Sequence, residues 1–201
     1  MRPRTIDDGE LLDMLLSAFA DLGYEGTSVR ALCRHLGVSH SMIHHRYQSK
    51  EQAWYAAVDH AFGRLNAQLT EDLPDAEPLE ILREVMTRFA KETIERPALA
   101  RIIHAEAARP GPRFDYLFDA YMLPIQQRVA TGLRTLQKEG IVRSGPVDVA
   151  FLFTTTWGLG GLAASREVVE RAASRRTNHF KSAELTIDII ISGLAARCGS
   201  A

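Results

Sequence analysis

The stretch Thr27–Tyr47, TSVRALCRHLGVSHSMIHHRY, decides how the N-terminal part of this chain folds. It predicts two short helices around a Gly-Val-Ser turn. Gly37 can adopt the positive φ that ends the first helix, Val38 supplies an apolar contact, and Ser39 can cap the second helix. This is the pattern of a helix-turn-helix unit, in which the second helix enters the major groove of DNA.

The second of these helices has an inward and an outward face. At about 100° per residue, Ile43 and Tyr47 lie on one face and should pack inward. The opposite arc is the natural surface for reading bases, and its shoulder can reach phosphates. The outward residues are Ser41, Met42 and His45, and those on the shoulder are His40 and His44.

The charge of the same region supports contact with a polyanion. Between Thr27 and Lys50 the chain carries four Lys or Arg and four His but no Asp or Glu. All 25 acidic residues lie elsewhere, in a chain whose formal net charge is −1. A near-neutral protein can still attract a duplex backbone through such a local basic patch. The alternative is a solvated charged face that happens to lack acids.

The remainder of the chain also predicts helices, because no stretch alternates apolar and polar residues for long enough to form a strand. Ser49–Gln52 is a capping-box pattern, which opens a long connecting helix over 49–69. The one clear linker is Asp72–Pro78. We therefore expect two domains, residues 1–72 and residues 73–201.

The second domain predicts a series of helices separated by Pro and Gly. Pro124 should kink or break the long third one, because proline lacks an N–H and clashes with the preceding turn. The expected helices cover 79–95, 98–109, 114–139, 147–171 and 182–197.

Residues 11–58 resemble the DNA-binding domain of the TetR (tetracycline-repressor) family of transcription regulators. The matching segments are Phe19-Ala20, Gly23-Tyr24, Thr27–Arg30, Gly37–Ser39 and Tyr47–Glu51. The chain length and the all-helical remainder fit this family as well, although the C-terminal domain matches only in outline.

The resemblance implies a homodimer in which each subunit has a three-helix head on duplex DNA and a helical body that binds a small effector. Carried over by position, Thr27 and Lys50 would contact phosphate, and Arg30 would lie at the groove edge. His44 departs from the family, which usually has a phosphate-contacting Tyr there, and Ser41 stands where Gly is frequent. The expected DNA-binding residues are Thr27, Ser28, Arg30, Ser39, His40, Ser41, Met42, His44, His45 and Lys50.

An aromatic-rich set of residues across the middle helices suggests an effector pocket. Such residues can line an apolar cavity and present a few polar tips, although ordinary core packing is the alternative for each of them. The effector would then be apolar or amphipathic. The candidate pocket residues are Met86, Phe89, His104, Phe118, Tyr121, Met122, Phe153 and Trp157.

Two apolar stripes predict the dimer interface. Each recurs at helical spacing, and a lone helix cannot bury both such a stripe and its core face, so a four-helix interface between subunits is the economical arrangement. The stripes are Phe151, Thr155, Leu159 and Leu162 in one helix, and Ile187, Ile190, Ile191 and Leu194 in the last helix.

Several function classes are disfavoured by the sequence. No nucleophile elbow, Walker lysine or paired-carboxylate site stands out, so we expect no enzyme and no cofactor. His40 and His44 have metal-ligand spacing but lack a third ligand, so no metal is expected. The two distant cysteines, Cys33 and Cys198, fit a reducing compartment. No signal region follows the N-terminus, and the low-charge run 149–165 is short for a membrane span, which predicts a cytoplasmic protein without a membrane partner.

The sequence thus favours a ligand-responsive, sequence-specific DNA-binding regulator. The expected form is a repressor that a small effector releases from an inverted-repeat operator. The alternative is a helical small-molecule-binding protein or enzyme with a non-functional helix-turn-helix.

Overall fold

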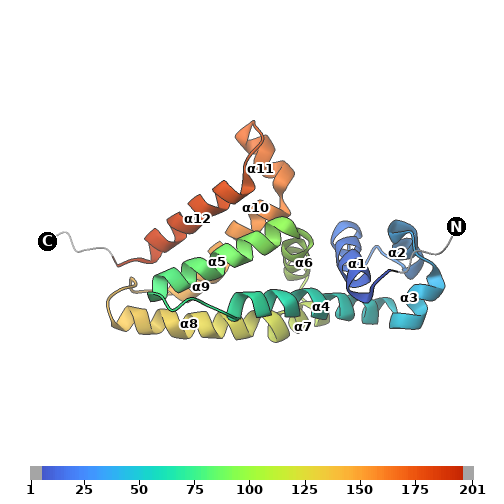
Figure 1. The fold of residues 1–201 in the computed structure, drawn as a ribbon, viewed down its shortest axis with the longest axis horizontal. Coiled ribbons are helices and arrows are strands. Elements are labelled where there is room, and N and C mark those ends of the chain that lie inside the picture. The colour runs from blue at the N-terminus through green and yellow to red at the C-terminus, as the bar shows by residue number, and fades with distance from the viewer. Residues whose placement is uncertain (1–5, 197–201) are drawn as a thin grey trace.

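The computed structural model describes residues 6–196, and within that range it contains helices and no β-strand, which confirms the all-α prediction (Figure 1). The last residue of the helix expected over 182–197 lies outside the described range, and so does Cys198. A small three-helix head stands at one end of the molecule and a larger helical body at the other (Figure 1). The head is formed by α1 (Asp8–Leu22), α2 (Val29–Leu36) and α3 (His40–Tyr47).

Capping side chains and a glycine set the limits of the helices around the head. The Ser39 hydroxyl accepts a hydrogen bond from the Met42 N–H at 3.2 Å, and that of Ser49 accepts one from the Gln52 N–H at 3.1 Å. Gly37 closes α2 in the left-handed conformation, with φ of 65°. These observations confirm the predicted turn and caps. The head then closes around fully buried side chains, which include Leu11, Leu15, Phe19, Leu32, Ile43 and Trp54.

A single long helix, α4 (Lys50–Thr70), joins the head to the body. Its N-terminal part packs on α1 and α3, whereas its C-terminal part packs on α5 and η1 of the body (Figure 1). Buried residues follow each other along its whole length, from Trp54 in the head to Leu69 in the body. The head is therefore anchored to the body by a continuous helix rather than by a flexible linker.

The body consists of the remaining helices, among which α10 and α12 both contact α5 and η2. The helical elements are α5 (Pro78–Glu95), α6 (Ala98–Ala107), α7 (Pro112–Leu117), the π-helix η1 (Phe118–Met122), α8 (Leu123–Lys138), α9 (Val147–Phe153), the π-helix η2 (Thr154–Leu159), α10 (Gly160–Ala164), α11 (Arg166–Ala173) and α12 (His179–Leu194).

The helix predicted over 114–139 is divided into three elements, as the proline in it suggested. The π-helix η1 ends just before α8, and Pro124 is the second residue of α8. A residue without an N–H leaves one helical hydrogen bond unmade, and a wider π turn is one way in which a helix accommodates such a defect.

The helices near the C-terminus differ in their limits from those predicted. The expected helix 147–171 contains η2 and turns at Ser165 into α11, which ends at Ala173. The last helix begins at His179, three residues earlier than predicted, because the Asn178 side chain caps it by accepting from the Lys181 N–H at 3.2 Å. Its end at Leu194 is marked by the carbonyl of that residue, which accepts from the Arg143 N–H.

One stretch of the described residues, Val147–Ala164, has the length and composition of a membrane-crossing helix, with a mean hydropathy of 1.3. In this fold it forms α9, η2 and α10, which pack against α5, α8 and α12. Some of its apolar side chains are therefore buried in the body, and others are exposed on its surface.

Candidate nucleic-acid interface and effector cavity

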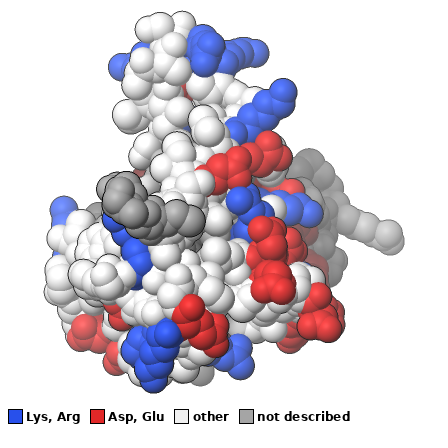
Figure 2. Space-filling model, turned by 90° about the vertical axis from the view of Figure 1, so that its left-hand side faces the viewer, with Lys and Arg blue, Asp and Glu red and all other residues white. Residues whose placement is uncertain are grey.

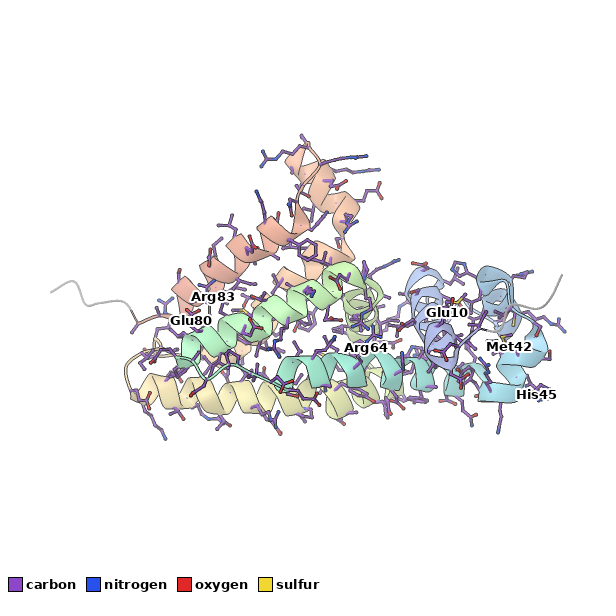
Figure 3. All side chains as sticks on the ribbon, viewed as in Figure 1. Glu10, Met42, His45, Arg64, Glu80 and Arg83 are labelled. Carbon is purple, nitrogen blue, oxygen red and sulfur yellow. The ribbon has the colours of Figure 1, made fainter. Side chains whose placement is uncertain are left out.

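The outward face of α3 is accessible to solvent. Ile43 is buried and Tyr47 half-buried, as the helical periodicity predicts, whereas Ser41 and His45 are exposed. Figure 3 shows Met42 and His45 at the end of the molecule farthest from the body. A face of about two turns that projects from the tip of the molecule can enter a major groove without a clash from the body.

The shoulder of α3 is also accessible. His40 and His44 are both exposed, and their rings stack with centroids 6.0 Å apart. The Ser39 hydroxyl caps α3 and also lies 3.0 Å from the Ser41 hydroxyl. Ser39 is thus held by the fold, while the two histidines are free to meet a backbone.

The residues at the start of α2 differ in how available they are. Arg30 is exposed, and so is Ser28, whose hydroxyl caps the helix by accepting from the Ala31 N–H at 3.2 Å. Thr27 is buried, with an exposed fraction of 3%, and its hydroxyl donates to the Gly23 carbonyl. Of these three residues, Arg30 is exposed and available for the predicted groove-edge contact, whereas the buried Thr27 shapes the turn before α2.

Lys50, at the first position of α4, lies beside this turn. Its Nζ donates to the Tyr24 carbonyl at 3.0 Å and sits 3.9 Å from the centroid of the Tyr24 ring. An ammonium group carries three donors, so two remain for another acceptor. The aromatic ring and the carbonyl therefore hold the Lys50 ammonium in place and leave two of its N–H groups available for a phosphate.

The positive charge of the head is partly compensated by acids of α1. Arg46 pairs with Asp8 at 3.1 Å, and the His35 imidazole lies 3.8 Å from the Asp21 carboxylate. The basic patch expected from the sequence is therefore less positive than its composition suggests. Among residues 6–196, no group of three potential metal ligands occurs, in the head or elsewhere.

The body contains an apolar cavity between α4, α5, α8 and α9. It consists of two adjoining pockets, an inner one of about 80 Å³ and an outer one of about 410 Å³ that lies between α4, α5 and α8, and Leu69, Val85, Ile125 and Val129 line both. The remaining residues of the inner part are Phe62, Leu65, Asn66, Phe89, Ile103, Tyr121, Met122, Gln126, Phe151, Leu152, Thr155 and Thr156.

Polar groups are sparse in the inner cavity. Asn66 donates to the Tyr121 carbonyl at 3.1 Å, and Gln126 to the Asp148 carbonyl at 3.3 Å. The buried hydroxyl of Thr155 has no hydrogen-bond partner among residues 6–196. This combination of apolar walls and one unpaired hydroxyl suits a ligand that is mostly hydrocarbon and has a polar group at one point.

Both π-helices border this cavity, η1 through Tyr121 and Met122 and η2 through Thr155 and Thr156. The Tyr121 hydroxyl donates to Asp59 Oδ1 of α4 at 2.7 Å, and the Tyr116 hydroxyl donates to the same oxygen at 2.6 Å. Burial raises the pKa of Tyr121, and the Asp59 carboxylate raises it further. These two phenols therefore remain hydrogen-bond donors to α4.

The cavity includes only part of the predicted pocket. Phe89, Tyr121 and Met122 line it, but the other five candidates do not. The structure places those five in four other environments. Met86 is fully buried in the core, Phe118 is half-buried outside the cavity, the His104 Nε2–H donates to the Thr156 carbonyl at 3.1 Å, and Phe153 and Trp157 stack on each other with centroids 4.8 Å apart.

Many of the residues of the inner pocket that the sequence did not reveal lie on α4 and α8, and the others lie on α5, α6, α9 and η2. Phe62, Asn66 and Leu69 follow one face of α4, and Ile125 and Val129 follow one face of α8. This spacing is a sequence signal, but core helices have the same periodicity, so it cannot distinguish a cavity wall from a filled core.

Most residues of the two stripes predicted for the dimer interface are buried within the protomer, so these stripes do not form an exposed interface. Phe151, Leu159, Ile187, Ile191 and Leu194 lie in the interior of one protomer, where Phe151 and also Thr155 line the cavity. Leu162 and Ile190 are half-buried against the same core. Periodicity identified the core faces of these helices and not their outward faces. Large apolar side chains are exposed elsewhere on them, namely Val149, Phe153, Phe180, Leu185 and Ile189.

These exposed residues belong to α9 and α12, which are the elements for which an interface was predicted. Figure 2 views the molecule from the end that carries the C-terminus and shows an uncharged surface that rises toward α11, where Lys and Arg gather at the tip. Five large apolar side chains in solvent are unfavourable for an isolated protomer. The outward faces of α9 and α12 are thus the candidates for contact with a second copy.

Comparison with known protein families identifies the head of this chain. Residues 11–52 match the family described as bacterial regulatory proteins, tetR family. The chain is 24% identical over 156 residues to an uncharacterized HTH-type transcriptional regulator of Bacillus subtilis, YezE, with 75% of this chain and 80% of that protein covered.

Solved structures show that the likeness in fold extends over the body. The ketosteroid transcriptional regulator KstR2 of Mycobacterium tuberculosis has a TM-score of 0.71 at 23% identity, with 93% of this chain and 94% of that chain covered. The TetR family regulator PfmR of Thermus thermophilus has a TM-score of 0.69 at 24% identity, with 92% and 95% covered. Residues 11–52 thus match the head of the bacterial regulatory proteins of the tetR family, and the solved structures show that the chain as a whole has the fold of these regulators.

Proposed function

We propose that this protein is a ligand-responsive repressor whose dimer binds an inverted-repeat operator and is released by a small apolar or amphipathic effector. The observation that carries the proposal is that one chain combines an accessible α3 at its tip with an apolar cavity in its body. In this proposal residues 1–72 form the DNA-binding domain and residues 73–201 form the effector-binding and dimerisation domain.

In the DNA complex, α3 reads bases, with the exposed Ser41 and His45 at the centre of the contact and Met42, which is half-buried against the core, beside them. The flanking basic groups contact the backbone, namely His40 and His44 on α3, Arg30 at the groove edge and Lys50 at the start of α4. Phosphate contacts set the register and base contacts set the specificity. Because the dimer has two-fold symmetry, its two α3 helices meet two half-sites related by inversion.

The effector occupies the cavity between α4, α5, α8 and α9. Its hydrocarbon part contacts Phe62, Phe89 and Val129, and one polar group bonds to the Thr155 hydroxyl. Such a ligand lowers operator affinity only if it binds the DNA-free arrangement of the protein more tightly than the DNA-bound arrangement.

The experiment that tests the operator part of this proposal is selection of bound duplexes from a random pool. We expect the recovered sequences to share two inverted half-sites whose centres lie about one helical turn, or a multiple of it, apart. Recovery of sequences without a common half-site would contradict the proposal. A variant in which Ser41 and His45 are both alanine serves as the control, since it should not recover the same half-site.

A further inference from the structure

A side chain of the body reaches into the head close to Lys50. Arg113, near the start of α7, has its guanidinium carbon 3.8 Å from the centroid of the Tyr24 ring, the ring that Lys50 Nζ also contacts at 3.9 Å. The Arg113 guanidinium also pairs with Glu25 of the head at 3.0 Å and with Glu106 of α6 at 3.1 Å. Arg113 thus joins two elements of the body to the turn that follows α1.

A cleft adjoins this contact, beside the packing of α1 on α6. The cleft, of about 410 Å³, lies between this turn and the helices α6 and α7, and Arg113 is one of the residues that line it. Glu106 is buried, so its carboxylate and the guanidinium form a charge-assisted pair in a place that water reaches poorly. That pair fixes the position of the guanidinium with respect to the body.

The turn that Arg113 contacts is also the turn to which the Lys50 side chain is bonded. The Tyr24 carbonyl accepts hydrogen bonds from the Thr27 N–H at 3.1 Å and from Lys50 Nζ at 3.0 Å. A guanidinium over the Tyr24 ring and an ion pair to Glu25 restrain two successive residues of this turn. Arg113 therefore contacts the residue whose carbonyl holds the Lys50 ammonium, beside the Phe19 and Trp54 rings that also pack on Tyr24.

We propose that Arg113 is a positioning residue for DNA binding, which acts through Tyr24 to hold the Lys50 ammonium where it meets a phosphate. The inference rests on the proposed function in one respect, the phosphate contact of Lys50. It adds that a residue of the effector-binding domain sets the strength of that contact, although it lies outside the DNA-binding surface. It also assigns a role to α7, which leads directly into the π-helix that borders the cavity.

The test is a double-mutant cycle on the duplex recovered by selection, with affinity measured across a range of salt concentrations. Arg113→Gln and Lys50→Ala should each weaken binding about tenfold and each lower the slope of log affinity against log salt by about one. The double variant should bind within about twofold of Lys50→Ala, because both substitutions remove the same contact.

The matched control is Arg101→Gln. Arg101 also joins the body to the head, through Asp21 at 2.6 Å, but no contact links this pair to Tyr24. Its effect on affinity should be the same in the wild-type and the Lys50→Ala background. A second variant, Glu106→Gln with Arg113→Gln, leaves no unpaired carboxylate buried at Glu106 and should bind the duplex as Arg113→Gln does, which separates the loss of the Tyr24 contact from the cost of an unpaired buried charge.

Additive effects of Arg113→Gln and Lys50→Ala would overturn the inference, and so would an Arg113→Gln variant with the salt slope of the wild type. Either result would leave the proposed function intact, because wild-type protein would still bind the selected duplex. A wild-type protein that fails to bind that duplex would contradict the proposed function itself.

Discussion

At the scale of single residues, the surface of the head contains two kinds of polar side chain. Some are exposed to solvent, and others are held by contacts within the protein. Ser41 and His45 are exposed on the outward arc of α3, whereas Lys50 is held by Tyr24. Residues of the first kind can distinguish bases, and residues of the second kind give affinity that does not depend on sequence. Substitutions should therefore separate specificity from affinity.

We expect His45→Ala and Ser41→Ala to change the preferred bases at one or two positions of each half-site, with a loss of about 1–3 kcal/mol on the original duplex. Lys50→Ala should weaken binding to all duplexes by a similar factor. Repeating the selection with each variant, followed by affinity measurements on the recovered duplexes, checks both statements. The assignment of α3 would be wrong if the Ser41 and His45 variants recovered the wild-type half-site.

At the scale of elements, the head could be predicted closely because its limits are set by neighbouring residues. A serine hydroxyl caps a helix through an N–H three residues away, as Ser39 and Ser49 do, and Gly37 supplies a left-handed turn by itself. Interactions of this short range are visible in a sequence.

The cavity and the interface depend instead on which faces meet across the body. The stripes that contain Phe151 and Ile187 have the same spacing whether they face a core, a ligand or a second subunit, and the structure places both residues in the interior. Tertiary packing decides among these outcomes, and a pattern of apolar residues does not encode it locally. The contact of Arg113 with the Tyr24 ring also depends on tertiary packing, so the sequence does not predict it.

The turn between α2 and α3 provides a stability test at this scale. Gly37→Ala should lower the free energy of unfolding by about 1 kcal/mol, because φ of 65° is costly for a residue with a Cβ. Gly63→Ala, within α4, should raise it by about 0.5–1 kcal/mol, because a Cβ there meets no atom within 4 Å and alanine favours the helix. Urea denaturation measures both, and a stabilising Gly37→Ala would contradict the assigned turn.

At the scale of the whole molecule, the exposed apolar faces of α9 and α12 predict the oligomeric state. Light scattering should give twice the 22.3 kDa mass of one chain. Leu185→Asp with Ile189→Asp should produce monomers, since both side chains are more than 60% exposed in the protomer and would lie in the interface. Leu22→Asp, at an exposed apolar residue of the head, is the control and should leave the dimer intact. A double variant that stays dimeric would place the interface elsewhere.

The cavity predicts a coupling between effector and operator. A panel of small amphiphiles can be screened for those that raise the unfolding temperature, and each ligand found should weaken operator binding about 5- to 150-fold. Val129→Phe adds a ring to a residue that lines both parts of the cavity, so it should prevent ligand binding while it leaves operator affinity unchanged. A ligand that binds the wild type but not this variant, and that leaves operator affinity unaltered, would contradict the proposed release.

Recognition of a particular duplex sequence by α3 is central to this protein's proposed role, and one measurement tests it most directly. Fluorescence anisotropy should compare the wild-type dimer on the selected duplex and on the same duplex with its half-sites scrambled, at one physiological salt concentration. We expect the selected duplex to bind at least about 1,000-fold more tightly, as specific regulators do. Equal affinity for the two duplexes would show that the head binds DNA without reading it, and would contradict sequence recognition by α3.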